Sequence, residues 1–511
     1  MLSKVCSAAT LGIDAVRITV EVDSHGAGQP GFRMVGLADL AVRESYARVK
    51  AALANSGFFF PNRHIVVSLS PADVKKEGSA FDLPIAIGIL HASEFLRDED
   101  VADRVFVGEL SLDGSVTAIR GTLSISSAVA KDRSIRELIV PMANANEAAA
   151  VEDVCVIGAV NLPCLLAHLR GDMPIARATS AVTAVPPREP VDFSDVRGQS
   201  LAKRALEVAA AGGHNVMMIG PPGSGKTMLA KRLPSILPRL TLEESIMTTK
   251  IHSVAGTLPP SSGLLVRRPF RAPHHTISTA GLAGGGRGPR PGEVSLAHHG
   301  VLFLDELTEF RRETLEALRQ PVEDGIVTIA RASRTVSFPA QFVMACALNP
   351  CPCGHFNDVR RECLCTSTQI ARYLSKISGP LLDRIDLQVE VAALSSDEVS
   401  SLEPGEPSSA IRDRVEAARA IQHDRFRGAR VTSNAEMTTR HLRKFCELST
   451  ASRQLLTQAI DRLGLSARAH DRILKVSRTI ADLASSERIE SAHLAEAVQY
   501  RALDRAYFGA G

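Results

Sequence analysis

The sequence predicts a multidomain α/β protein that ends in an all-helical part, and three observations support this prediction. The chain has 511 residues, which is too long for a single hydrophobic core. Residues 218–233 read as a buried strand, a glycine-rich turn and the start of a helix, which is the local order of a parallel α/β unit. Five helical patterns follow one another after residue 410.

The composition narrows the class of protein. Hydrophobic residues make up 45% of the chain and charged residues 23%, as in soluble globular proteins. The net charge of +3 is too small to argue for nucleic acid by itself. We find no apolar run long enough to span a bilayer and no secretory signal, so we expect a cytoplasmic protein with no membrane partner.

The first part of the chain predicts an α+β unit, with strands at 15–22 and 64–69 and helices at 44–56 and 82–96. Residues 71–82 and 108–116 resemble the proteolytic domain of Lon-type proteases, which has a ribosomal-S5-domain-2-like fold. That protease needs a serine and a lysine. When the glycines are aligned, these positions fall on Ala80 and Ile125, so the resemblance implies a Lon-protease-like domain at 1–175 without its catalytic dyad. A proline-rich linker is expected at 176–192.

The glycine-rich turn matches the phosphate-binding P-loop, Gly-x-x-x-x-Gly-Lys-Thr. Its glycines let backbone N–H groups approach phosphate oxygens, and the helix N-terminus that follows favours negative charge. Lys226 can reach the outer phosphates of ATP, and the Thr227 hydroxyl can ligate Mg²⁺. The predicted ATP-binding residues are Gly220, Pro221, Pro222, Gly223, Ser224, Gly225, Lys226, Thr227 and Met228.

Two further apolar strands end in polar residues that suit ATP hydrolysis. The strand at 300–304 is followed by Asp305 and Glu306, the Walker B pattern. Asp305 would hold Mg²⁺ and Glu306 would polarise the attacking water. The strand at 341–348 ends at Asn349, which would help to orient that water; a plain turn residue is the alternative.

Two arginines are candidates for contact with the γ-phosphate. Arg384 would act as an arginine finger, and if it acts on the nucleotide of a neighbour the protein must be an oligomer. The alternative is an internal pair with Asp383 or Asp386. Arg468 opens the fourth of the five helices and matches a second sensor, with Arg472 and Arg478 as rivals on the same helix.

Longer motifs carry a family resemblance. Residues 268–276 and 284–298 look like those of the magnesium-chelatase-like AAA+ ATPases, and 349–354 narrow the resemblance to the ComM/YifB branch. It covers nearly the whole chain. The resemblance implies an AAA+ core at 193–392, a helical lid at 393–511 and a homo-oligomer, expected to be a hexamer. It also implies a DNA motor that drives branch migration when incoming DNA recombines in natural transformation.

Two basic stretches are candidates for the DNA contact. Residues 324–336 alternate as a β-hairpin with Arg331 and Arg334 near its tip. The insertion at 253–293 carries five arginines among glycines and prolines, and a solvated charged surface is the alternative for any one of them. These arginines are Arg267, Arg268, Arg271, Arg287 and Arg290.

Four of the nine cysteines lie close together in the loop 351–365. Four thiolates suit a closed tetrahedral Zn²⁺ site, and His355 is a possible substitute ligand. Free thiols or a redox disulfide are the alternatives. The predicted zinc ligands are Cys351, Cys353, Cys363 and Cys365.

Four other functions are alternatives to the DNA motor. They are a chelatase subunit that helps insert Mg²⁺ into a tetrapyrrole, another remodelling ATPase without a DNA function, an enhancer-binding transcription activator, and an ATP-dependent protease. Ala80 and Ile125 disfavour the protease. The pairs His274–His275 and His298–His299 are expected to have structural or polar-network roles rather than to bind a metal.

Overall fold

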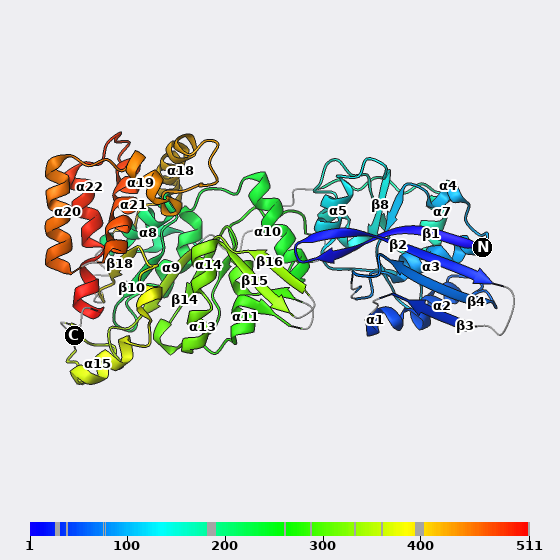
Figure 1. Cartoon of the computed structure of the whole chain (residues 1–511), viewed down its shortest axis with the longest axis horizontal. Coiled ribbons are helices and arrows are strands. Elements are labelled where there is room, and N and C mark those ends of the chain that lie inside the picture. Colours follow the sequence, from blue (N-terminus) through cyan, green and yellow to red (C-terminus); the bar gives the residue numbers. More distant parts are fainter. Residues whose placement is uncertain are drawn as a thin grey trace.

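A computed structural model describes residues 1–25, 31–36, 39–74, 76, 78–180, 191–259, 262–286, 289–331, 334–358, 361–393, 403–464 and 466–508. The molecule is elongated (Figure 1), with the N-terminal part at one end, the last five helices at the other, and the P-loop region between them. Within the described residues, no helix is both long enough and apolar enough to span a bilayer.

A seven-stranded sheet in the order β3-β4-β2-β1-β5-β8-β9 forms the N-terminal part. The first two strands pair antiparallel along their whole length, from Leu2 opposite Asp23 to Leu11 opposite Asp14. The fully buried helix α3 packs on these two strands. The bounds are β1 (Leu2–Leu11), β2 (Asp14–His25), β3 (Gly31–Val35), α1 (Leu40–Arg43), α2 (Ser45–Asn55), β4 (His64–Ser70), α3 (Asp82–Ala92), α4 (Asp98–Val101), β5 (Arg104–Phe106), β6 (Glu109–Leu110), β7 (Val116–Thr117), α5 (Thr122–Val129), β8 (Glu137–Pro141), α6 (Ala145–Ala148), β9 (Val156–Ala159) and α7 (Leu162–Leu169).

The two strands and two helices predicted in this part are confirmed as β2, β4, α2 and α3. The sequence did not reveal β1, although it has ten residues. Its buried face carries the small polar residues Ser3 and Ser7 beside Val5, all 0% exposed. The apolar alternation that marks a half-buried strand is therefore weak in β1. Residues 181–190 of the expected linker lie outside the described residues.

Five parallel strands in the order β11-β14-β17-β10-β18 form the central sheet. Strands β10, β14 and β17 are buried at every position, as expected for a parallel sheet that is covered on both faces. The bounds are α8 (Ser200–Gly212), β10 (Val216–Ile219), α9 (Lys226–Ile236), α10 (Leu242–Ala255), β11 (Phe270–Arg271), α11 (Thr279–Ala283), β12 (Gly284–Gly285), β13 (Arg290–Pro291), α12 (Glu293–Leu296), β14 (Val301–Leu304), α13 (Arg312–Glu316), α14 (Arg319–Asp324), β15 (Ile326–Arg331), β16 (Arg334–Pro339), β17 (Val343–Leu348), α15 (Ser367–Leu374), α16 (Gly379–Leu382) and β18 (Leu387–Glu390).

The five predicted C-terminal helices are all present, and they share one hydrophobic core with α8 and α9. The chain then returns to the central sheet, where the backbone N–H of Gln388 donates to the carbonyl of Tyr500 at 3.0 Å. This helical part is therefore packed continuously onto the central part. The bounds are α18 (Ser408–Arg425), α19 (Thr439–Phe445), α20 (Thr450–Leu463), α21 (Ala467–Leu483) and α22 (Ser491–Gln499).

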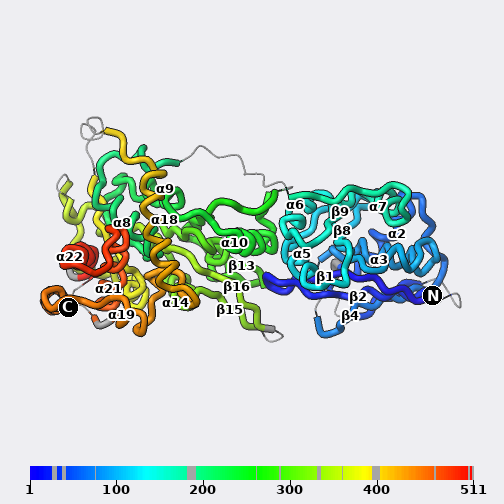
Figure 2. Tube along the Cα trace, turned by 90° about the horizontal axis from the view of Figure 1, so that it is seen from above, coloured from blue at the N-terminus to red at the C-terminus, as the bar shows by residue number. Residues whose placement is uncertain are grey.

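Among the described residues, two groups of contacts join the N-terminal part to the central part. Helix α5 lies next to α10 in Figure 1 and in Figure 2, and the N–H of Gly121 donates to the carbonyl of Ser253 at 3.3 Å. The Ser253 hydroxyl also donates to the buried Glu147. In the second group the turn between β1 and β2 lies against β16, because a Cβ on Gly12 would be 2.8 Å from Val336 Cγ1.

Candidate nucleotide site

The P-loop, Gly220–Thr227, leaves the central sheet at the carboxyl end of β10. Gly223 and Gly225 have φ of +77° and +93°, in the left-handed region that favours glycine. At Gly220 the constraint is space, since a Cβ there would be 2.2 Å from the carbonyl oxygen of Val391. The glycines of the motif are therefore required by backbone geometry at three of its positions.

Lys226 is 8% exposed and points back into the loop that it closes. Its ammonium donates to the carbonyls of Gly220 at 2.6 Å and Pro221 at 2.8 Å, and to Asn349 Oδ1 at 3.3 Å. Burial lowers the pKa of Lys226 to about 8, although the nearby carboxylate of Asp305 opposes the shift. The structure thus brings together the predicted phosphate-binding lysine and the predicted sensor asparagine.

Thr227 and Asp305 meet where a Mg²⁺ ion is expected. The Thr227 hydroxyl donates to Asp305 Oδ2 at 2.7 Å, and the backbone N–H of Glu306 donates to Asp305 Oδ1 at 3.0 Å. A hydroxyl and a carboxylate are hard oxygen ligands of the kind that Mg²⁺ prefers, usually with several waters. These residues therefore fit the ion that the motifs imply.

Glu306 has φ of +51° and an exposed side chain, and its Oε2 lies 3.3 Å from Nδ1 of His275. The ring of His275 is tilted against that of His274, with centroids 4.1 Å apart, and lies edge-on to Phe310. The sequence predicted only a structural or polar-network role for His275. His275 follows β11, the parallel neighbour of the strand before Asp305. A known order of the strands would therefore have indicated that His275 lies near Glu306.

The second histidine pair has the structural role that was expected. His298 is 3% exposed, and its Nδ1 accepts from the N–H of Gln341 at 3.0 Å. Burial lowers the pKa of His298, so the ring is neutral and suited to accept this bond. His299 lies 3.6 Å from Glu244 on α10.

The segment before α8 also reaches the P-loop. Gln199 donates through Nε2 to the carbonyls of Ala392 at 2.7 Å and Ser224 at 3.4 Å. Ser224 itself is 6% exposed, and its hydroxyl lies 3.5 Å from Lys226 Nζ. The Gln199 side chain therefore connects the end of β18 to the P-loop backbone.

Arg384 lies at the opposite edge of the sheet from the P-loop. Its carbonyl accepts from Asn215, the residue directly before β10, at 2.9 Å. Its guanidinium donates to Pro380 O at 2.6 Å and pairs with Glu323. The expected alternative was a pair with Asp383 or Asp386, and neither is its partner among the contacts of the described residues. Arg384 therefore faces away from the nucleotide site of its own chain.

Arg468 lies beside Arg384 and not at the P-loop of its own chain. It donates to Asp383 Oδ2 at 3.1 Å, and both arginines contribute to the lowered pKa of Glu323. The other two candidates on this helix form pairs within the chain. Arg472 pairs with Asp386, and Arg478 donates to Asp482 at 3.0 Å. Arg468, with 67% of its side chain exposed, is the member of the three that faces solvent.

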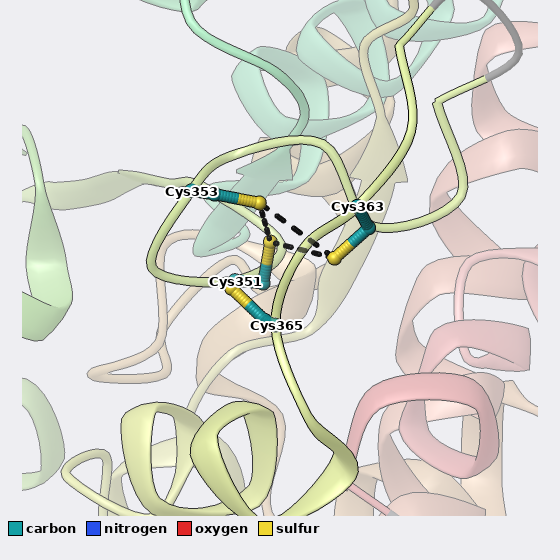
Figure 3. A group of neighbouring side chains, drawn as sticks. All are labelled: Cys351, Cys353, Cys363 and Cys365. Carbon is teal, nitrogen blue, oxygen red and sulfur yellow. Dashed lines mark hydrogen bonds between the residues drawn. The ribbon is translucent and has the colours of Figure 1, made fainter.

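The four clustered cysteines converge on one point (Figure 3). Their sulfurs all lie within 4.8 Å of one another, and Cys351 is 3.3 Å from Cys353 and 3.7 Å from Cys363. A tetrahedral zinc site with Zn–S bonds of about 2.3 Å places its sulfurs about 3.8 Å apart. The four thiols, completed by Cys365, therefore fit a zinc ion. His355 pairs with Asp358 at 3.0 Å instead of joining the group.

The cysteine loop also lies against the P-loop. A Cβ on Gly354, whose φ is +84°, would be 2.5 Å from Pro222 Cδ. Pro222 belongs to the predicted ATP-binding residues, as does Met228, which follows Thr227 in α9. The shape of the cysteine loop thus affects both Asn349, which precedes it, and the P-loop beside it.

The predicted hairpin is confirmed as β15 and β16, whose register brings Arg331 opposite Arg334 at its end. In the insertion, Arg268 and Arg271 were DNA candidates, but they form internal pairs with Glu244 at 3.0 Å and Glu293 at 2.6 Å. That expectation is therefore corrected for these two residues. Arg290 is exposed on β13, and Arg287 lies outside the described residues.

Comparison with known proteins agrees with this geometry. The families described as "Magnesium chelatase, subunit ChlI", "Subunit ChlI of Mg-chelatase" and "Magnesium chelatase, subunit ChlI C-terminal" match residues 192–399, 20–144 and 405–501. A magnesium-chelatase 67 kDa subunit from Chlorobaculum parvum is 28% identical over 31% of this chain and 23% of its own length.

Several relatives, including the following two, match over nearly the whole length. Competence protein ComM from Haemophilus influenzae is 44% identical over 99% of this chain and 98% of its own. The uncharacterized protein YifB from Escherichia coli is 43% identical with the same coverage. The P-loop, the Walker B carboxylates and these alignments lead to one conclusion: the chain belongs to the ComM/YifB family of magnesium-chelatase-like AAA+ ATPases.

Proposed function

We propose that the protein is an ATP-driven, ring-forming DNA motor, expected to be a hexamer, that drives branch migration when incoming DNA recombines in natural transformation. One observation carries the proposal. The P-loop and the pair Arg384–Arg468 lie at opposite edges of the same sheet, so a complete ATP site needs two copies of the chain. A ring supplies such a site at every interface. The similarity to a competence protein supports the link to transformation.

The residues of one copy would prepare ATP for hydrolysis. A bound Mg²⁺ ion would neutralise part of the negative charge of the triphosphate. Lys226 exchanges its carbonyl partners for phosphate oxygens, while Thr227 and Asp305 hold the ion. Glu306 orients and polarises the attacking water, and Asn349 fixes the position of that water. His275 keeps Glu306 turned aside until the site is complete.

The neighbouring copy would supply the missing positive charge. Arg384 and Arg468 leave Glu323 and Asp383 and contact the γ-phosphate across the interface. A guanidinium is always charged, so it stabilises the charge that builds up in the transition state. Hydrolysis is thereby coupled to contact between copies.

DNA would lie against the basic hairpins. Arg331 and Arg334 end the β15–β16 hairpin, and Arg290 lies on β13 of the β12–β13 hairpin beside it. Arg287, which lies outside the described residues, is proposed for the same contact. Arginines on projecting loops suit a phosphate backbone without reading its sequence. Single-stranded or branched DNA is therefore the proposed partner.

The proposal keeps the domain division expected from the sequence. Residues 1–175 form the Lon-protease-like domain without a catalytic dyad, 176–192 the linker, 193–392 the AAA+ core and 393–511 the helical lid. A chelatase-type subunit, or a remodelling ATPase without a DNA function, is the second candidate. It is favoured by the family matches but weakened by the chelatase relative, which covers only 31% of this chain.

We further propose that Cys351, Cys353, Cys363 and Cys365 bind a structural zinc ion. The convergence of four thiols supports this. The ion would fix the loop that connects Asn349 to the contact with Pro222, and would keep the sensor and the P-loop in register.

The first prediction concerns Lys226. Phosphate contacts favour its charged form, so its pKa rises from about 8 when ATP binds. Below pH 8 the lysine is already protonated, and this group adds no pH dependence. Above pH 8 binding requires proton uptake, and affinity falls by up to about tenfold per pH unit. Calorimetry of Mg·ATP binding at pH 7 and pH 9, in buffers of different ionisation enthalpy, measures both effects. Equal affinity and no proton uptake at pH 9 would contradict this.

The second prediction concerns Arg384. Arg384→Ala and Glu306→Gln each abolish ATPase activity, because each removes one half of the shared site. In a one-to-one mixture, about a quarter of the interfaces join an intact Glu306 to an intact Arg384 from the other variant. The mixture therefore regains about a quarter of the wild-type rate. No recovery, in rings shown by native mass spectrometry to be mixed, would place Arg384 at the site of its own chain.

The third prediction tests the DNA role. Arg331→Ala with Arg334→Ala should abolish stimulation of the ATPase by single-stranded and branched DNA, while the basal rate stays unchanged. The salt dependence of DNA binding should also fall by about one unit of slope per arginine. Arg427→Ala with Arg430→Ala, in the helical part, is the matched control. If DNA stimulates the ATPase of none of these proteins, including the wild type, the proposal of a DNA motor is wrong. The chelatase-type function is then favoured.

The fourth prediction concerns zinc. Protein purified without chelator should contain about one zinc per chain. Cys353→Ser with Cys363→Ser should remove the metal and lower the melting temperature, whereas Cys164→Ser, an exposed cysteine outside the cluster, should change neither. Metal analysis that finds no zinc in the wild type rules the site out.

A further inference from the structure

A cavity of about 300 Å³ lies between the N-terminal part and α10 of the central part. Its walls come from β1, β2, β5, α5 and the segment that follows α5. Among the described residues that line it, Lys250 alone belongs to the ATPase core. The volume is at the lower end of the range for small-molecule sites. Neither nucleotide binding nor the proposed DNA contact uses this cavity.

The cavity has a polar group that lacks a partner. Ser7 is fully buried in its lining, and its hydroxyl has no hydrogen-bond partner within the described part of the chain. The other serines of the wall are satisfied, since Ser124 donates to the carbonyl of Ile13 and Ser127 to that of Leu123, at 2.7 and 2.8 Å. A buried hydroxyl without a partner is costly, so a ligand that bonds to Ser7 would remove that cost.

The charges around the cavity favour an anion. Arg17 is neutralised by Asp132 at 3.0 Å, but Lys131 and Lys250 have no carboxylate oxygen within 4.0 Å among the described residues. Burial lowers the pKa of Lys250, Asp14 opposes this, and the positive charge of Lys131 adds to it. Lys131 and Lys250 thus bring two positive charges to the cavity beside the single remaining carboxylate of Asp14, and a bound anion would balance the excess charge.

The rest of the wall is apolar, with Val105, Val129 and Ile135 among its residues. We propose that the cavity binds a small organic anion, a carboxylate or a phosphate ester with an apolar body, between Lys131 and Lys250. The apolar body lies against the valines and isoleucine, and a polar atom of the ligand bonds to the Ser7 hydroxyl.

Such a ligand would act on the ATPase because it joins two parts of the molecule. Lys250 lies on α10 one turn before Ser253, which bonds to Gly121 and Glu147 of the N-terminal part. Helix α10 also packs on β13, and β1 continues from the cavity into the turn that contacts Val336 of β16. The ligand thus strengthens the junction that supports both basic hairpins. The binding site itself does not depend on the DNA role.

The test uses the full-length protein saturated with ADP and Mg²⁺, so that the P-loop is filled. Binding of benzoate and of phenyl phosphate is measured by calorimetry, with benzamide as the uncharged counterpart of benzoate. We expect one site for at least one of the anions and none for benzamide. Lys250→Met and Ser7→Ala should each weaken binding, the former by about tenfold or more, and Lys444→Met on α19 should leave it unchanged.

The outcomes are distinct. Binding of benzoate alone identifies a carboxylate site, binding of phenyl phosphate alone a phosphate-ester site, and both support the proposal. It is overturned if neither anion binds at about 10 mM, if benzamide binds equally well, or if Lys250→Met binds like the wild type. Should Lys250→Met fail to fold, Lys131→Met, in the exposed segment after α5, replaces it in the same comparison.

Discussion

The parallel pairing of β10, β17 and β14 is the constraint on which the rest of the structure depends. Its register places Ile219 beside Leu348 and Leu304 beside Cys346, so the P-loop, Asn349 and Asp305 all leave the sheet at one edge. All three strands are buried and apolar, which keeps the charged groups at their ends. The functional groups are therefore arranged by packing that takes no part in the chemistry.

Helix α10 connects the N-terminal part by packing to the strand that precedes Asp305. Helix α10 contacts α5 on one side, and His252 of α10 lies 3.0 Å from the carbonyl of Leu296 on the other. Leu296 is followed by the short turn that starts the Walker B strand, and Glu244 of α10 lies beside His299 in that turn. A displacement of α10 would thus be transmitted through packed groups to Asp305 and Glu306. These contacts form a continuous packed route from α5 through α10 to the Walker B strand. Double-mutant cycles measure the coupling energy along it.

The local motifs could be predicted from the sequence, but relations between distant segments could not. The P-loop, the Walker B strand, the β15–β16 hairpin and the five C-terminal helices follow from short-range patterns, and the structure contains each of them. Strand β1 was not predicted, because two serines interrupt the apolar residues of its buried face. The contact between His275 and Glu306, and the internal pairing of Arg268 and Arg271, depend on the order of strands in the sheet. The spacing of residues along the chain does not indicate the order of the strands in the sheet.

In the proposed ring, the position of the two arginines would make each ATP site depend on assembly. In one copy, Arg384, with 12% of its side chain exposed, is paired with Glu323, which is 62% exposed. Arg468, which is 67% exposed, is paired with Asp383, which is 33% exposed. The exposed pair of Arg468 with Asp383 contributes only about 0–1 kcal/mol, because water screens it and the side chains lose freedom. A triphosphate held by a neighbouring P-loop offers more negative charge in a drier environment, so exchanging partners costs little and gains a stronger interaction. The carboxylates thus keep the arginines in place before assembly without competing strongly against the nucleotide.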